Sequence, residues 1–400
     1  MLVPFEGHVV RPEWAERVVS PAYDGVNATE RRKMMDENPY VFLHVTRSPE
    51  DVAEGSPRDP GALADSSATA LQRLLDADAY ESYGPAVYLY RLRLGDHLQT
   101  AVVADVPVAI ADEGRLRPHE RTRAARASLL GHHLERVRVS SSPIAVTYRE
   151  HPGVDDIVET VTAGPPILAF SDASGLEQTV WRVADPALIA NLDDAIGDAV
   201  LYITDGHHRT AAAVAARNAL AAAGTLAEDH PARFMLCALF PAAQLQVYPF
   251  HRMVTVDGAP ADAVAALAAA GALTAADGPV AGSGARTFGV HAAGHWWRLD
   301  VDARGDDGGA LPADVLQDRV LRPVFGIDDP GASDRIEYLP GTAGLDTLAE
   351  RCGLTGTVGF ALEATGVDTL MDVVDAGRVL PPKSTFFHPK PRSGIFLRLR

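Results

Sequence analysis

Residues 199–224 read AVLYITDGHHRTAAAVAARNALAAAG, and this stretch decides the fold class. Its first part is continuous and apolar, as expected of a strand that is buried on both faces. The alanine-rich run after Arg209 has the highest helix propensity available, and Gly224 can end the helix in a left-handed conformation. The segment therefore predicts a strand–loop–helix unit inside an α+β (mixed α/β) protein.

The loop DGHHR at residues 205–209 has the composition of an anion-binding site. Backbone N–H groups at the start of a helix lack partners, and together with the helix dipole they attract phosphate or carboxylate. Gly206 lets the chain turn sharply and lets a ligand approach the backbone. His207, His208 and Arg209 add donors for phosphoryl oxygens, and Arg209 is best suited to a bidentate contact. Asp205 can hold a divalent cation or accept the proton of a hydroxyl group.

Two other interpretations of this loop remain open from the sequence. Asp205 can simply cap the helix while the histidines pack or face solvent. A metal site is the second alternative, but adjacent histidines point in different directions and no histidine follows four residues later on the helix. A structural zinc site is therefore not expected, and no metal ligand is assigned.

Residues 115–126 (RLRPHERTRAAR) concentrate positive charge in a chain whose net charge is −17. A local basic cluster in an acidic protein indicates a small anionic ligand rather than a polymer. Glu120 lies among these arginines, stays ionised there, and can accept a proton from a substrate hydroxyl. The alternative is a solvated basic turn that forms ion pairs with Asp112 and Glu113.

The closing stretch GRVLPPKSTFFHPKPR at residues 377–392 superficially resembles a phosphate loop. The required second glycine is replaced by Pro382, which has no N–H to donate. Lys383, Ser384, Thr385 and Lys390 are predicted to reach phosphate through their side chains, and a rigid loop packed through its phenylalanines is the alternative. His251 and Arg252 follow a predicted strand and are expected in the same cleft, with a structural histidine as the alternative.

Length and composition exclude several classes of protein. Four hundred residues predict two packed units, and we place the boundary near residue 255, giving regions 1–255 and 256–400. The acidic balance argues against nucleic acid as a partner. The start of the chain lacks a signal-peptide pattern, no stretch is apolar enough for a membrane span, and two cysteines build no disulfide framework. A cytoplasmic protein without membrane or nucleic-acid partners is expected.

Local patterns predict several further elements. We expect strands at 40–46, 144–148 and 394–399, a helix at 66–79, and a hairpin of strands 86–92 and 100–106. No G-x-S-x-G elbow occurs, and no G-x-G-x-x-G follows a strand and opens a helix, so a serine hydrolase and a dinucleotide cofactor are not supported.

Seven motifs occur in the order expected of the DUF1015 family, and the chain is identified on them as a member. They are Ser20-Pro-Ala-Tyr-Asp-Gly25, Asn38-Pro-Tyr40, Pro118-His-Glu-Arg-Thr122, Ser142-Pro-Ile144, Ile203-Thr-Asp-Gly-His-His-Arg209, His251-Arg252 and Pro381-Pro-Lys-Ser-Thr-Phe-Phe-His-Pro-Lys390. The Asp-Gly-His-His-Arg turn also resembles the loop with which ParB/sulfiredoxin-like proteins, including kinases of free serine, hold nucleotide phosphates. This resemblance implies a ParB/sulfiredoxin-like core in region 1–255, with region 256–400 returning the basic loop 381–392 to the site.

The resemblance implies a kinase that transfers a phosphoryl group from ATP or ADP, with Mg²⁺, to the hydroxyl of a small metabolite such as free L-serine. The implied catalytic residues are Glu120, as the general base, Asp205 and His207. The implied nucleotide- and phosphate-binding residues are Gly206, His208, Arg209, Thr210, Lys383 and Ser384, with Lys383 neutralising charge on the transferred group. The implied substrate-binding residues are Tyr23, Asp24, His119, Arg121, Thr122, His251 and Arg252. Two departures from the family pattern, Ala22 and Thr210, bear on substrate details. A homodimer is possible, and a nucleotide-hydrolysing switch or a metal-dependent phosphohydrolase is the alternative function.

Overall fold

The computed structural model describes residues 1–400 except 53–54, 56, 123, 303–309 and 400, and it leaves the side chains at 24, 124 and 125 undescribed. The chain forms two compact units. The first consists of Met1–Leu245 together with Pro389–Arg400, and the second of Gln246–His388. The sequence predicts a domain boundary near residue 255 and assigns the closing strand at 394–399 to region 256–400.

The first unit is built on one large mixed sheet of order β4-β9-β6-β10-β3-β2-β1-β19-β5, in which β8 pairs with β2 and with β7. Its strands are β1 (Phe5–Val10), β2 (Tyr80–Leu94), β3 (His97–Pro107), β4 (Leu116–Arg117), β5 (Val139–Ser140), β6 (Ile144–Tyr148), β7 (Leu168–Ser171), β8 (Glu177–Val183), β9 (Leu201–Asp205), β10 (Phe234–Pro241) and β19 (Phe396–Leu399). The last strand pairs antiparallel with β1 and β5, which is why the end of the chain belongs to this unit.

Both faces of this sheet are buried. Along β2, Tyr88 and Tyr90 contribute to one apolar cluster, while Val87 and Leu89 contribute to another. Successive side chains of a strand point to opposite faces, so the two clusters lie on the two sides of the sheet. A sheet covered on both sides confirms the predicted mixed α/β class. The predicted hairpin is confirmed as β2 and β3.

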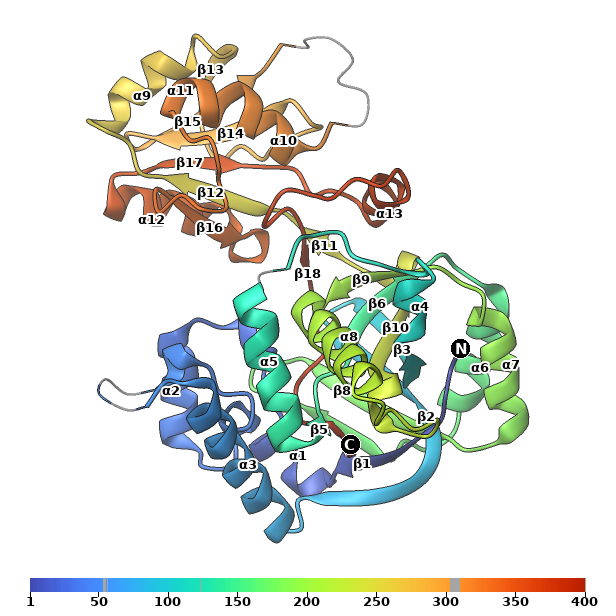
Figure 1. Ribbon diagram of the computed structural model, residues 1–400. Helices are drawn as coiled ribbons and strands as arrows, with labels where there is room; N and C mark the ends of the chain where they lie inside the picture. Colours follow the sequence, from blue (N-terminus) through green and yellow to red (C-terminus); the bar gives the residue numbers. More distant parts are fainter. Residues whose placement is uncertain (53–54, 56, 123, 303–309, 400) are drawn as a thin grey trace. The chain divides into compact units, whose positions relative to one another are not determined.

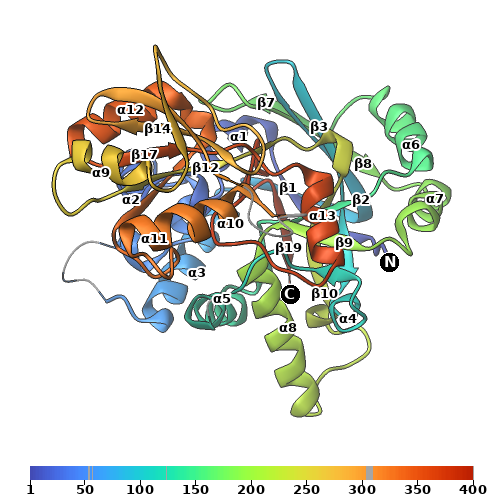
Figure 2. The same cartoon turned by 90° about the horizontal axis from the view of Figure 1, so that it is seen from above.

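Helices and short turns surround the sheet of the first unit. They are α1 (Pro12–Val18), η1 (Tyr23–Gly25), α2 (Ala28–Glu37), η2 (Phe42–His44), η3 (Pro49–Asp51), α3 (Pro60–Asp76), α4 (Ala109–Asp112), α5 (Ala124–Val137), α6 (Pro152–Thr162), α7 (Pro186–Ile196), α8 (His207–Ala222), η4 (Pro231–Arg233) and η5 (Ala242–Gln244). Helices α5 and α8 pack side by side (Figures 1 and 2). In the part of the chain that the structure describes, no helix has the length and apolar character needed to cross a membrane.

The strand predicted at 40–46 is wrong. This segment forms the turn η2, and Phe42, Leu43 and Val45 are all buried. A short apolar run has no decisive periodicity, and here packing against the core on several sides favours a turn over an extended strand.

The second unit contains an antiparallel sheet of order β13-β15-β14-β17-β12-β16 and a separate pair, β11 with β18. Its strands are β11 (Val247–Tyr248), β12 (Phe250–Val254), β13 (Ala272–Ala276), β14 (Thr287–Ala292), β15 (His295–Asp300), β16 (Ile336–Pro340), β17 (Val358–Ala361) and β18 (Phe386–Phe387). Its helices are α9 (Pro260–Leu267), α10 (Pro312–Leu316), η6 (Gln317–Leu321), α11 (Arg322–Phe325), η7 (Gly341–Ala343), α12 (Gly344–Thr355) and α13 (Val367–Asp375). Phe288, Val290 and Phe360 lie at the centre of its core.

Candidate functional site

The turn from β9 into α8 has the predicted sharp geometry. Gly206 is the N-cap residue of α8 and has a φ of 101°, in the left-handed region that favours glycine. The first intrahelical bond runs from the Thr210 N–H to the Gly206 carbonyl at 2.9 Å. A Cβ atom at position 206 would lie 3.0 Å from the Arg209 guanidinium. Glycine therefore permits both the turn and the close approach of Arg209.

The carboxylate of Asp205 forms ion pairs and does not cap the helix. One oxygen accepts from the Lys390 ammonium at 2.7 Å, and the other accepts from the Arg209 guanidinium. Burial by itself would raise the pKa of Asp205, but the charges of Lys390 and Arg209 outweigh it and hold this pKa well below its usual range. The interpretation of Asp205 as a simple helix cap is therefore wrong.

Arg209 is fixed by three acceptors. Besides Asp205, its guanidinium donates to the backbone carbonyls of Ser142 and Pro143, the latter at 2.7 Å. The motif Ser142-Pro-Ile144 thus supplies carbonyl groups that orient this side chain. Arg209 therefore links the first turn of α8 to Asp205 at the end of β9 and to the Ser142–Pro143 backbone.

Lys390 belongs to the closing loop 381–392, whose side chains the sequence predicts to reach phosphate, and its ammonium contacts Asp205. It lies 185 positions after Asp205, so no local pattern links the two residues. Shortly after Lys390, Ser393 attaches the end of the chain to the first unit. Its backbone pairs with Ser20, and its hydroxyl lies 2.8 Å from the hydroxyl of Ser142. Residues from four of the seven family motifs, Ser20, Ser142, Asp205 and Lys390, therefore meet at this return of the chain.

Glu120 lies beside the first residue of α8. Its Oε1 atom is 3.3 Å from Nδ1 of His207, and 37% of its side chain is exposed. His207 Nε2 accepts a hydrogen bond from the backbone N–H of His119 at 3.3 Å. An imidazole nitrogen that accepts carries no proton, so a neutral His207 is protonated at Nδ1 and donates to Glu120. His207 thereby orients the carboxylate.

His119 in turn holds His207. Its ring meets the ring of His207 edge-on at 4.5 Å between centroids, and its Nδ1–H donates to the Ile203 carbonyl at 2.6 Å. Burial lowers the pKa of His119 to about 4, and burial followed by repulsion from His119 lowers the pKa of His207. Both rings are neutral at neutral pH. Only 4% of His119 is exposed, so its contacts are with the protein interior.

A second polar cluster surrounds Tyr23. Its ring lies between two guanidinium groups, those of Arg31 at 4.0 Å and of Arg126 at 4.4 Å from the ring centroid. Its hydroxyl is 2.7 Å from the Ser48 hydroxyl and 2.6 Å from a carboxylate oxygen of Glu50. Arg126 belongs to α5, the helix that follows the Glu120 loop, so this cluster is connected to the same segment.

The remaining predicted residues are distributed as follows. His208 is half-buried in the first turn of α8, Arg121 and Thr122 are exposed, and the Asp24 side chain lies outside the described residues. Thr210 is buried and its hydroxyl donates to the Gly206 carbonyl. His251, Arg252, Lys383 and Ser384 all belong to the second unit.

The predicted residues of the second unit partly contact one another. The Arg252 guanidinium donates to the Lys383 carbonyl at 3.2 Å, and the Ser384 hydroxyl donates to the Pro381 carbonyl at 2.7 Å. His251 Nδ1 accepts from the Leu362 N–H, and burial lowers the pKa of His251 to about 4.

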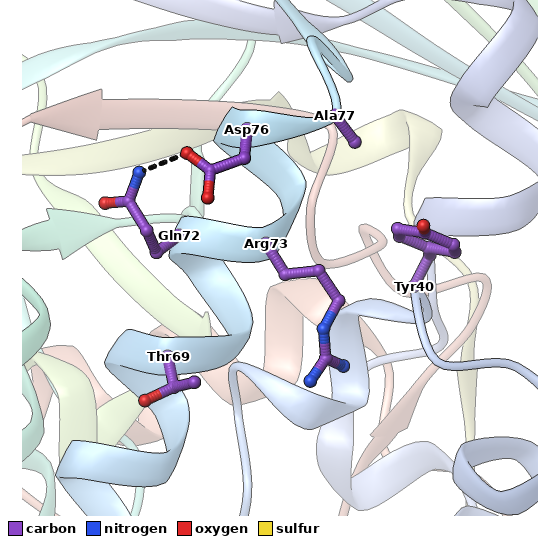
Figure 3. A pocket seen from close by; sticks show the side chains of 6 residues that line it. All are labelled: Tyr40, Thr69, Gln72, Arg73, Asp76 and Ala77. Atoms are coloured by element: carbon purple, nitrogen blue, oxygen red, sulfur yellow. Dashed lines mark hydrogen bonds between the residues drawn. The ribbon is translucent and has the colours of Figure 1, made fainter.

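A cavity of about 510 Å³ occurs elsewhere in the first unit, along α3 (Figure 3). It contains none of the predicted site residues. Its polar side chains are bonded within the protein, because Gln72 donates to Asp76 and Arg73 to the Pro39 carbonyl. The residues that line it are Tyr40, Thr69, Gln72, Arg73, Asp76 and Ala77.

Among the residues that the structure describes, no three or more His, Cys, Asp or Glu side chains form a group that could hold a metal ion. Both Asp205 oxygens accept from cations, and both His207 nitrogens have partners.

The fold and the β9–α8 corner define a mixed α/β protein with a partly buried turn, rich in charged side chains, at the start of a helix. The chain belongs to the DUF1015 family, a family of unknown function whose model matches residues 2–322. No curated protein matches it.

The chain is also similar to several solved structures. A free serine kinase in complex with AMP is 15% identical, with 75% of this chain and 91% of that chain covered and a TM-score of 0.38. A conserved hypothetical protein from Pyrococcus furiosus is 14% identical (74% and 95% covered, TM-score 0.36). SbnI with a C-terminal truncation, from Staphylococcus aureus, is 13% identical (74% and 87% covered, TM-score 0.39). Similarities at this level do not assign an activity to the chain.

Proposed function

We propose that this protein is a nucleotide-dependent phosphotransferase that acts on the hydroxyl group of a small metabolite, with free L-serine as the first candidate. The observation that carries the proposal is the position of Glu120, a partly exposed carboxylate oriented by His207 at the first residue of α8. A general base beside the start of a helix combines proton removal with a site that attracts phosphate.

The start of α8 favours a phosphate ligand. Lys390 and Arg209 balance the charges of Asp205 and Glu120. The attraction therefore rests on the field of the α8 N-terminus, where the backbone N–H groups of the first turn have no partners within the helix. In a partly buried site these interactions are stronger than in water. The ParB/sulfiredoxin-like description of this unit is part of the same proposal.

The proposed reaction divides the work among few residues. The α8 N-terminus and Lys390 hold and neutralise the phosphates of ATP or ADP, and Glu120 takes the proton of the acceptor hydroxyl. The acceptor oxygen forms the new bond to phosphorus as the bond to the departing nucleotide breaks. His119 and Arg209 act as positioning residues, the first through His207 and the second through Asp205.

Mg²⁺ would accompany the nucleotide and neutralise charge on its phosphates. Because both Asp205 oxygens are engaged by cations, this residue does not fit as a metal ligand in the described conformation. The phosphate oxygens themselves would supply most of the coordination, as is common for nucleotide-bound Mg²⁺.

The test is to incubate the protein with ATP or ADP, Mg²⁺ and a panel of hydroxy amino acids, and to detect products by mass spectrometry. We expect a phosphorylated acceptor and the nucleotide shortened by one phosphate, in equal amounts. Nucleotide loss without any phosphorylated acceptor would instead identify a hydrolase. Failure of every nucleotide and acceptor to react would contradict the proposal.

A further inference from the structure

Arg252, on strand β12 of the second unit, is a buried guanidinium. Only 4% of the residue is exposed. Its guanidinium donates to the carbonyls of Phe250 and Lys383, and it lies 5.3 Å from the centroid of the Tyr338 ring. Burial lowers the pKa of Arg252 to about 10, with a smaller opposing effect of Tyr338. The side chain is therefore a cation held in an environment of carbonyls and aromatic rings.

Arg252 has no carboxylate partner among the described residues. Its hydrogen bonds go to backbone carbonyls. Buried charges in proteins are ordinarily paired, because removing an ion from water is costly unless an opposite charge compensates it. Arg31 in the first unit shows the ordinary arrangement, since this buried guanidinium pairs with buried Asp51 at 2.7 Å.

Lys383 brings a second cation to the same place. Its ammonium lies 5.0 Å from the centroid of the Phe250 ring, and the Phe250 and Tyr338 rings meet edge-on at 6.4 Å. The two cations thus contact adjacent members of one aromatic cluster. Neither forms an ion pair within the described part of the second unit.

The backbone of Lys383 is strained in a way that supports a binding role. Its φ is 56°, in the left-handed region that non-glycine residues rarely adopt. This conformation occurs in the turn whose carbonyl accepts from Arg252. Strain of this kind persists only where the surrounding structure imposes it, and it is concentrated at ligand-binding positions.

We propose that the second unit contains its own binding site for an anionic group, a phosphate or a carboxylate of a small molecule, with Arg252 and Lys383 as its cationic partners. The anion would supply the charge that Arg252 lacks, and the aromatic rings of Phe250 and Tyr338 would exclude water and strengthen the interaction. The site lies entirely within the second unit and does not depend on the function proposed for the β9–α8 corner.

The alternative is that Arg252 only fastens the 381–384 turn to β12 through its carbonyl bonds. Hydrogen–deuterium exchange measured by mass spectrometry separates the two explanations, because it localises protection along the chain. The full-length protein is titrated with inorganic phosphate and, separately, with malonate, at constant ionic strength adjusted with chloride. We expect either anion or both to slow exchange in residues 250–254 and 383–387.

Variants make this experiment decisive. Arg252→Gln should weaken the anion-dependent protection about tenfold or more, because a charge-assisted bidentate contact is lost. Arg351→Gln, which removes a partly exposed arginine paired with Glu337 in the same unit, is the matched control and should retain this protection. Glu120→Gln should also retain it, which separates this site from the corner of the first unit.

Lys383→Gln provides the second line of evidence if Arg252→Gln does not fold. The Lys383 side chain is exposed, so its substitution should leave the fold intact and weaken protection several-fold. Protection by phosphate alone would identify a phosphoryl ligand, and protection by malonate alone a carboxylate. The proposal is overturned if neither anion protects the wild-type segments, or if protection is unchanged in both Arg252→Gln and Lys383→Gln.

Discussion

The β9–α8 corner of the first unit and the cluster of Arg252, Lys383, Phe250 and Tyr338 in the second unit differ in how their charged side chains are compensated. At the corner, Asp205 is compensated by Lys390 and Arg209, and His207 donates to Glu120. In the second unit, Arg252 contacts carbonyls and aromatic rings, with no carboxylate partner among the described residues. Internal ion pairs hold the groups proposed for catalysis in place, whereas we propose that the buried cation of the second unit, which has no carboxylate partner among the described residues, accepts one from a ligand.

The largest expected effect concerns Glu120. Glu120→Gln preserves size and removes the basic carboxylate, so phosphoryl transfer should fall by about 10²- to 10⁴-fold. The change is measured as the rate of acceptor phosphorylation. Glu113→Gln is the matched control, because Glu113 is an exposed glutamate whose partner is Arg115. Equal rates for the two variants would remove Glu120 from the mechanism.

The next effect is on stability at the corner. Lys390→Met leaves the partly buried Asp205 carboxylate with Arg209 alone and should lower the free energy of unfolding by about 3 kcal/mol. Lys33→Met, at an exposed lysine, should change it by less than about 0.5 kcal/mol. Urea denaturation measures both, and the double variant Lys390→Met with Asp205→Asn should recover part of the loss. A cost no larger than that of Lys33→Met would show that the ion pair does not stabilise the corner.

The neutral histidine pair predicts a specific pH dependence. Burial lowers the pKa of His119 from 6.5 to about 4, so the unfolded chain binds this proton more readily than the folded protein does. Above pH 6.5 the His119 ring is neutral in both states and does not reduce stability. As the pH falls towards about 4, the pKa in the folded protein, only the unfolded chain gains this proton, so the free energy of unfolding decreases. Between about pH 6.5 and about pH 4.5, protonation of His119 in the unfolded chain should lower the free energy of unfolding by about 2 kcal/mol.

Other buried groups titrate in the same pH range. The effect of His119 is therefore measured as the difference between the wild type and a variant that lacks this ring. His119→Gln keeps a donor for the Ile203 carbonyl and removes the titrating ring. Its free energy of unfolding should depend less steeply on pH than that of the wild type over this interval. Parallel curves for the two proteins would contradict the account of His119 as a buried neutral residue.

The smallest effect is expected at Arg252. In buffer without phosphate or carboxylate anions, Arg252→Met removes two hydrogen bonds to carbonyls but also removes a desolvated charge. The two changes oppose each other, and the free energy of unfolding should change by about 1 kcal/mol or less. Urea denaturation would contradict this if the loss equalled that of Lys390→Met, because Arg252 would then be fully compensated within the protein.

Local patterns in the sequence were sufficient to predict strand β9, helix α8 and the turn between them. The apolar run at 199–204 and the alanine-rich run after it became strand Leu201–Asp205 and helix His207–Ala222. Gly206 and the DGHHR loop were predictable because the geometry of a strand-to-helix turn restricts which residues fit there. Glu120 was singled out by its charged surroundings, which are also local in sequence.

Contacts between distant segments were not predictable in the same way. Lys390 reaches Asp205 only because β19 pairs with β1 and returns the end of the chain to the first unit. His119 was predicted to bind substrate, but its ring is buried against His207, a contact that no pattern in the sequence encodes. The turn at Phe42–His44 was mistaken for a strand because short apolar runs fit either structure.

The most direct test of the central claim is to locate the nucleotide on the protein. Hydrogen–deuterium exchange of the full-length chain is measured with and without ADP in the presence of Mg²⁺. The account predicts slower exchange in residues 205–210, at the start of α8, together with the Glu120 loop. Protection confined to the α3 cavity lined by Tyr40 and Arg73, or no protection anywhere, would contradict it.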